Sequence, residues 1–299
     1  MFKLLHGKFI IRNRLQPDGD TVRFKPDNVH FVEELRQGSQ DRLGVGEDVN
    51  IRLEAIDALE KDQELEGATT ARDELLSRLG FTDPAFSGSP PFIVTSGYQE
   101  VSGHVLSNGF DSFGTRLVGF IFRGDGSARG SDGSAFALST DIVDESINTA
   151  LLSEGFVFPA FYDTLPPNLR KHLAAKSIDA RQAKKGVWLR SKGFPADPLI
   201  LNTPILANLR TAVSWPKLYR RLEKYLETQR PKDITGFEDW LQEDSQLRDD
   251  GILIIKSNLP ELVRLHDVVD VSGNRIKLKY WPDEFIIQGH PTNPNQSQP

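Results

Sequence analysis

The stretch Arg52–Glu60, RLEAIDALE, decides the fold that we expect for this chain of 299 residues. Apolar side chains alternate with polar ones over residues 49–55, which is the period of a strand with one buried face. Two acids, Asp57 and Glu60, follow directly after this strand. The stretch therefore predicts a half-buried strand that places the side chain of Arg52 and two carboxylates close to one another.

Three further short stretches carry related chemistry. The first is Asp18–Val22, DGDTV, in which Asp-Gly predicts a turn that leads into a strand. The others are Phe113–Arg116, FGTR, and Lys184–Trp188, KKGVW. Carboxylates such as Asp20 suit a hard cation, and a glutamate suits proton transfer from water. Arginines such as Arg116 suit the growing charge of a phosphate under attack, so the set favours phosphodiester cleavage.

Composition sets limits on these interpretations. Hydrophobic and charged fractions of 38% and 26% are ordinary for a globular protein with one large or two modest domains. The absence of cysteine excludes disulfides, thiolate metal sites and cysteine nucleophiles, and the six histidines lack the spacing of a zinc site. A net charge of −6 argues against extended coating of nucleic acid, although it leaves room for a local site.

The chain shows no sign of a membrane segment or a signal peptide. No apolar run approaches the roughly 18 residues that span a bilayer. At the N-terminus, Lys8 interrupts the apolar residues, and no small-residue cleavage site follows. We therefore expect no membrane partner and a cytoplasmic location, with secretion only if the sequence is that of a trimmed chain.

The pattern of strands and helices predicts an α+β fold. Short strands in the first half are interleaved with predicted helices at 68–79, 144–154 and 167–185, and residues 27–48 are expected to form a loop. Further along, we predict a Pro-rich linker at 191–205, a helix at 216–229, strands at 252–255 and 275–280, and a disordered tail at 290–299. The charged face of the helix at 216–229 could touch a nucleic-acid backbone, but its leucines favour an ordinary amphipathic helix with charges facing outward.

Taken together and in order, the four stretches resemble the staphylococcal nuclease-like (thermonuclease) family over roughly residues 8–190. The resemblance implies a five-stranded OB-type β-barrel with three packed helices over residues 1–190. Residues 206–289 would form a C-terminal α/β extension of unknown role.

The resemblance also implies a set of site residues. Asp20, Asp57 and the carbonyl of Ala58 would bind a calcium ion, while Arg52, Glu60 and Arg116 would be catalytic. Phe113 and Phe161, together with Tyr162, would contact the substrate. In this assignment the barrel is a calcium-dependent nuclease that hydrolyses DNA, RNA or both with little sequence specificity.

Three departures from the family pattern keep other functions open. Leu59 replaces the usual proline and could loosen the loop that places Glu60. Thr115 separates Gly114 from Arg116, and residues 81–102 look like an insertion that could gate or block the site. The main alternative is a catalytically inactive module that binds nucleic acid or protein. A third possibility places the function in residues 200–299.

Overall fold

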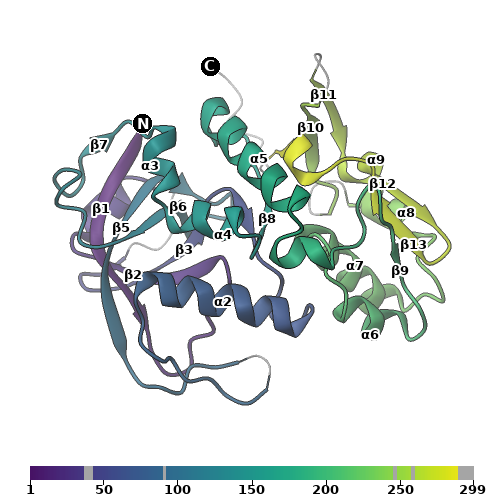
Figure 1. The fold of residues 1–299 in the computed structure, drawn as a ribbon, viewed down its shortest axis with the longest axis horizontal. Helices are drawn as coiled ribbons and strands as arrows, with labels where there is room; N and C mark the ends of the chain where they lie inside the picture. Colours follow the sequence, from purple (N-terminus) through teal and green to yellow (C-terminus); the bar gives the residue numbers. More distant parts are fainter. Residues whose placement is uncertain (37–42, 90–91, 245–247, 257–259, 289–299) are drawn as a thin grey trace.

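The computed structural model describes residues 1–36, 43–89, 92–244, 248–256 and 260–288. Figure 1 shows an α+β molecule with the N-terminal strands on one side and the C-terminal helices and short strands on the other. Within the described residues, buried hydrophobic side chains form two clusters. The first cluster lies in and around the N-terminal sheet, and the second joins this part to the C-terminal part.

The N-terminal strands close into a barrel. In the described part of the chain these are β1 (Phe2–Ile11), β2 (Thr21–Pro26), β3 (Val49–Leu53), β5 (Gln99–Phe110) and β6 (Arg116–Arg123). Their order is β2-β3-β6-β5-β1, and pairing of β1 with β2 closes the ring. β3 and β6 run parallel, whereas the other neighbours are antiparallel. The α+β class and a five-stranded barrel consistent with an OB-like arrangement are thus confirmed, with β7 (Ala135–Phe136) added beside β1.

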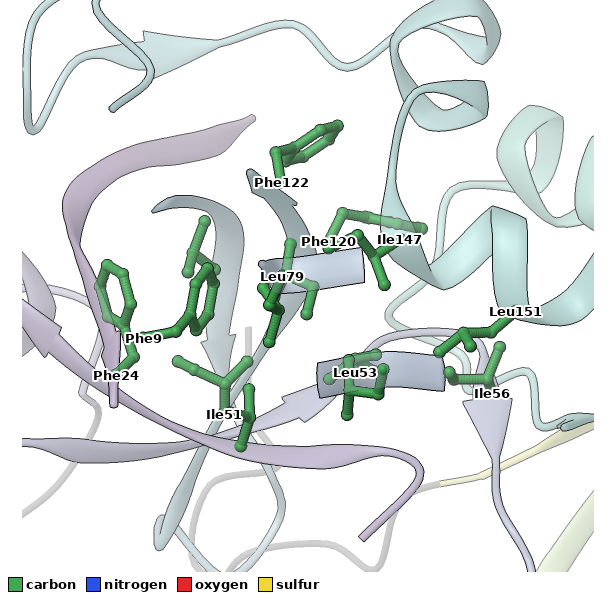
Figure 2. Close-up of a cluster of buried hydrophobic side chains, with 14 of the residues drawn as sticks. Phe9, Phe24, Ile51, Leu53, Ile56, Leu79, Phe120, Phe122, Ile147 and Leu151 are labelled. Atoms are coloured by element: carbon green, nitrogen blue, oxygen red, sulfur yellow. The ribbon is translucent and has the colours of Figure 1, made fainter. Parts of the chain in front are cut away.

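Alternating side chains fill the barrel, as the period of two predicts. On β2, Val22 and Phe24 are buried, and the residues that alternate with them, Thr21, Arg23 and Lys25, are partly exposed. The ring of Phe24 lies 5.1 Å from that of Phe9, and Figure 2 shows both beside Ile51. Burial of such rings is a major source of stability, on the order of 1.5–3 kcal/mol for each side chain.

The first long helix, α2 (Leu65–Leu79), ends at Gly80 as predicted and begins three residues earlier than expected. It begins there because the side chain of Glu64 accepts a hydrogen bond of 2.8 Å from the backbone N–H of Gly67. The short helix α1 (Val29–Glu33) lies in the stretch that we predict to be a loop. Residues 37–42 of that stretch lie outside the described residues.

The predicted helix at 144–154 is present as α4 (Ile147–Ser153), and a further short helix, α3 (Thr140–Asp144), precedes it. Ser146 separates them because its hydroxyl accepts a hydrogen bond of 3.1 Å from the N–H of Thr149 and so begins a new helix. The predicted helix at 167–185 is confirmed as α5 (Pro167–Gln182), which is followed by the 3₁₀ turn η1 (Gly186–Leu189).

The C-terminal part contains short helices and two small sheets. Its helices are α6 (Ile205–Arg210), α7 (Pro216–Gln229), α8 (Phe237–Gln242) and α9 (Leu265–Val268), with the 3₁₀ turn η2 (Pro282–Glu284). One three-stranded sheet has the order β11 (Glu261–Arg264), β10 (Gly251–Ile254), β14 (Phe285–Ile287). The other has the order β12 (Val269–Ser272), β13 (Arg275–Leu278), β9 (Leu199–Ile200).

The second core joins the two parts of the molecule. Next to the barrel, β4 (Ile56–Asp57) pairs with β8 (Phe158–Pro159). The indole N–H of Trp215 donates to the carbonyl of Pro159 at 3.3 Å, and the N–H of Ile287 donates to the carbonyl of Phe161 at 2.7 Å. The stretch 191–205, where we predict a linker, contributes four buried side chains to this core: Phe194, Leu199, Leu201 and Ile205.

The predicted tail at 290–299 lies outside the described residues. Of the helices that the structure describes, none combines the length and the apolar character needed to cross a membrane.

Candidate functional site: an acid–arginine cluster between barrel and helix α7

The loop before β2 is held against α2 and against the residue that follows β4. A Cβ atom at Gly19 would lie 2.6 Å from the Cβ of Ala71 and 2.7 Å from the Cβ of Ala58, so only glycine permits this approach. The carboxylate of the next residue, Asp20, is therefore buried. It accepts hydrogen bonds from the N–H of Ala58 at 3.0 Å and from the hydroxyl of Thr21 at 2.9 Å.

Arg52 on β3 joins two of the predicted carboxylates. Its Nη2 donates to Oδ1 of Asp57 at 2.7 Å and lies 3.6 Å from Oδ2 of Asp20. Burial opposes the charge on the guanidinium, but Asp20 and Asp57 outweigh it and hold the pKa of Arg52 above its usual range. The predicted proximity of these three residues is present in the structure.

A tight turn brings Asp57 back toward Arg52. After β3, Ala55 adopts a left-handed backbone conformation with φ of 71°, which is uncommon for a residue other than glycine. Asp57 follows on β4 and is only 1% exposed. A carboxylate buried this deeply needs cationic partners, and Arg52 is the first of them.

Arg220 on α7 is the second cationic partner, and it comes from outside the segment that resembles the nuclease family. Its Nη2 lies 3.1 Å from Oδ2 of Asp57, and its Nη1 lies 3.2 Å from Oδ1 of the same carboxylate. Nη1 also donates a hydrogen bond to Oε1 of Glu60. The side chains of Arg220 and Glu60 are 31% and 33% exposed, so the cluster opens to solvent on this side.

These contacts shift the pKa values of the cluster in different directions. Burial raises the pKa of Asp57, but Arg220 and Arg52 outweigh it, so the net shift is downward. For Glu60 burial dominates over the attraction of Arg220, and its pKa is raised. The pKa of Arg220 is raised because Asp57 and Glu60 outweigh the cost of its burial. Asp57 is therefore held as a carboxylate, while Glu60 is the group more disposed to accept a proton.

Leu59 explains how the loop between the two acids is fixed without the proline of the family pattern. Its side chain is buried in the second core. A Cβ atom at Gly67 of α2 would lie 2.6 Å from Cδ1 of Leu59, which shows how closely the loop lies against this helix. Hydrophobic burial of Leu59 is therefore the contact that anchors the loop, and the looser loop expected from the missing proline stays a prediction.

Arg116 is turned away from the cluster. Its Nε donates to Oδ2 of Asp111 at 2.9 Å, and the N–H groups of Thr115 and Arg116 donate to the other oxygen of Asp111 at 2.9 and 3.2 Å. In the part of the chain that the structure describes, Arg116 pairs with this aspartate and with none of the three carboxylates of the cluster. The register does place Arg116 opposite Asn50, two residues from Arg52 on β3.

The three predicted substrate-contacting residues have different surroundings. Phe113 is 61% exposed, in the turn that Asp111 organises. Phe161 is fully buried in the first core, so its ring is not accessible to a base, and this part of the prediction is corrected. Tyr162 is partly buried against the second core, and Nζ of Lys217 lies 5.8 Å from the centre of its ring.

The arrangement also bears on the predicted calcium ligands. Carboxylate and carbonyl oxygens are the donors that calcium prefers. Both oxygens of Asp57, however, accept hydrogen bonds from Arg220, and Glu60 is bound to the same guanidinium. Among the described residues no group of three or more His, Asp or Glu side chains could hold a metal ion. The set of Asp20, Asp57 and Ala58 therefore does not fit calcium while Arg220 is in place.

Comparison with known proteins gives no family for this chain. No protein-family model matches it, and no curated protein matches it. The interpretation of the cluster therefore depends on its own geometry.

Two residues of the cluster region are not predicted from the sequence. Asp111 is an ordinary acid in a turn, and its proximity to Phe113–Arg116 is the only available signal. Arg220 lies on the face of 216–229 that we predict to point outward. The amphipathic pattern is confirmed for Leu218, Leu222 and Leu226, which are buried. It is wrong for Arg220, whose guanidinium faces Asp57 instead of open solvent.

Proposed function

We propose that the barrel is a phosphodiester hydrolase that cleaves DNA, RNA or both with little sequence preference. The observation that supports it best is the convergence of Asp20, Asp57 and Glu60 around Arg52 and Arg220. Grouping three carboxylates raises their mutual repulsion, so a module that only binds anionic nucleic acid has no electrostatic reason to gather them.

Each residue of the cluster has a distinct role in this proposal. Glu60 accepts the proton of the attacking water, and its raised pKa brings it closer to the working pH of a general base. Arg52 donates hydrogen bonds to phosphate oxygens whose negative charge grows in the transition state. Arg116 adds a second guanidinium from the neighbouring strand once it releases Asp111.

The charge balance indicates that the described arrangement is a closed state of this site. Three carboxylates face two guanidinium groups, which leaves one formal negative charge in the cluster. A phosphodiester carries a further negative charge and would be repelled at short range. Departure of Arg220 alone would leave two formal negative charges, so cleavage requires that another cation take its place on the carboxylates.

A second candidate function is a non-catalytic module on the same barrel that binds nucleic acid or protein. The specific observation that favours it is again the position of Arg220, since its guanidinium occupies oxygens of two of the three acids, Asp57 and Glu60.

Cleavage assays with labelled single-stranded DNA and RNA test the first candidate. We expect Glu60→Gln to lower the cleavage rate by about 10²–10⁴, the usual contribution of a general base. Because the resemblance implies calcium, each assay is run with calcium and with chelator. The matched control is Glu66→Gln, which changes an exposed glutamate on α2 and should leave the rate unchanged.

The result decides between the two candidates. Cleavage that the Glu60 variant loses and the Glu66 variant retains supports the hydrolase. Retention of labelled nucleic acid without cleavage by the wild-type protein, with calcium and with chelator alike, would support the binding module instead.

A further inference from the structure

The ion pair between Arg220 of α7 and the acid cluster has no role of its own in the proposed function. Arg220 spans Asp57 and Glu60 with one planar guanidinium, the geometry in which arginine binds carboxylates most strongly. It lies 160 residues from Glu60 along the chain. Contacts of this quality at a buried carboxylate replace the solvation that Asp57 has lost.

The backbone of Arg220 is held in place, but its side chain can rotate away from the carboxylates into solvent. On the opposite face of α7, Leu218, Tyr219 and Leu222 are fully buried in the second core, so the helix cannot move without opening that core. The side chain of Arg220 is long and about one-third exposed toward solvent. Rotation of this side chain alone can therefore free both carboxylates.

A divalent cation and the guanidinium need the same oxygen atoms. Both oxygens of Asp57 already accept hydrogen bonds from Arg220, and one oxygen of Glu60 does so too. Like charges at such short separation repel strongly in a partly buried site. Only one of the two cations can occupy the cluster at a time.

We propose that Arg220 is the resident cation of this site: it competes with a divalent metal ion for Asp57 and Glu60, and it thereby sets how tightly such an ion binds. The inference deepens the proposed function, on whose acid–arginine cluster it rests. The apparent affinity for the ion is reduced by the fraction of molecules in which Arg220 has left. If that fraction is about 1–10%, removal of Arg220 strengthens binding by roughly ten- to a hundredfold.

The test measures cation binding and not cleavage. Wild-type protein, Arg220→Gln and Arg221→Gln are titrated with Mn²⁺, followed by electron paramagnetic resonance, and with Ca²⁺, followed by calorimetry. Arg221 is the matched control, because it is the neighbouring arginine on α7 and pairs with another buried aspartate, Asp250. We expect at least tenfold tighter binding by Arg220→Gln and unchanged binding by Arg221→Gln. Adding Asp57→Asn to the Arg220 variant should abolish the gain.

Other outcomes overturn the proposal. Equal affinity of the wild-type protein and Arg220→Gln, or a gain that survives the added Asp57→Asn, would show that Arg220 does not compete for this site. If Arg220→Gln folds only when a cation is added, its folding is measured by circular dichroism at increasing calcium concentration. Folding that depends on calcium then shows the same gain in cation affinity.

If Arg220→Gln does not fold under any condition, Arg220→Lys serves as the second variant, since it keeps the charge but cannot span both carboxylates. An affinity of Arg220→Lys equal to that of the wild-type protein would then overturn the proposal. Tighter cation binding by a variant that cleaves nothing leaves this inference in place and contradicts the hydrolase. One of the two proposals can therefore be contradicted while the other stands.

Discussion

The pKa of Glu54 depends strongly on the surroundings of its side chain. Glu54 lies on the strand end between Arg52 and Asp57, is 2% exposed, and has one carboxylate oxygen without a hydrogen-bond partner. Burial raises its pKa to about 7, although the N–H of Ala55 and the charge of Arg52 act in the opposite direction. A carboxyl group in this position is therefore largely protonated in the folded protein below neutral pH.

This shift predicts a pH-dependent stability. Because the folded-state pKa lies above the unfolded value of about 4.5, the unfolded chain binds fewer protons between these two values. The free energy of unfolding should fall by about 3 kcal/mol as the pH rises from 4.5 to 7, and should not fall further from this group above that range. Glu54→Gln removes this loss, so the free energy of unfolding of the variant, relative to that of the wild-type protein, should increase as the pH rises.

Urea unfolding at pH 5 and at pH 7.5 measures the difference. Glu66→Gln, on the exposed side of α2, is the control and should follow the wild-type protein at both values. A Glu54→Gln protein with the same pH dependence as the wild-type protein would contradict a buried, protonated Glu54.

The proximity of individual site residues can be predicted from the sequence where neighbouring strands or a short turn bring them together. Asp20, Arg52 and Asp57 meet because β2 and β3 are neighbouring strands and because β4 follows β3 after one turn. Arg220 has no such local signal, because its place is fixed by side chains on the other face of its helix.

At the scale of elements, the turn after α4 and the turn after α5 pack against each other through one glycine from each, Gly155 and Gly186. Gly155 and Gly186 have φ of 75° and 49°, and the N–H of Val187 donates to the carbonyl of Gly155 at 2.8 Å. A Cβ atom at Gly186 would lie 2.1 Å from the carbonyl oxygen of Gly155. The backbone itself fills the space, so no side-chain rearrangement can make room.

We therefore predict that Gly186→Ala lowers the free energy of unfolding by about 1–3 kcal/mol or more, since both the backbone conformation and the space are unsuitable. Gly88→Ala is the control, because a Cβ atom there meets nothing within 4 Å. Thermal and chemical unfolding compare the two. Equal stability of both variants would mean that the turn can rearrange.

Element types follow from periodicity more reliably than element boundaries do. The helix α7 agrees with its predicted range because a four-residue spacing of leucines is a strong local signal. The predicted helix at 144–154 begins at Ile147 because the hydroxyl of Ser146 caps it there. The strand β5 begins at Gln99, within the predicted insertion, because residues 99–102 pair with β1.

At the scale of the whole molecule, the barrel and the C-terminal part share one core. Trp188 lies edge-on against Phe158 with ring centres 4.8 Å apart, and Trp281 stacks on Phe194 at 5.2 Å. Gln63, which is fully buried, donates to the carbonyl of Ser214 at 2.8 Å. A core shared by two parts of a chain cannot be predicted from the sequence. The same hydrophobic runs are equally compatible with two separate small cores.

We predict that residues 1–190 alone lose much of their stability, because the cut would expose side chains of the second core such as Leu59 and Trp188. The expected readouts are a lower midpoint of thermal unfolding and binding of a dye that reports exposed apolar surface. The full chain under the same conditions is the control. A fragment that unfolds at the wild-type temperature would show that the barrel needs nothing from the C-terminal part.

The contact of Arg220 with Glu60 also has a consequence for the newly made chain. Glu60 leaves the ribosome 160 residues ahead of its partner, which at ordinary rates of translation is an interval of about 10–30 s. During synthesis the three acids thus exist for some time without the arginine that later pairs with two of them. In the competition that we propose, ions that the cell supplies would reach these acids before Arg220 does, and the finished protein would exchange them for its own side chain.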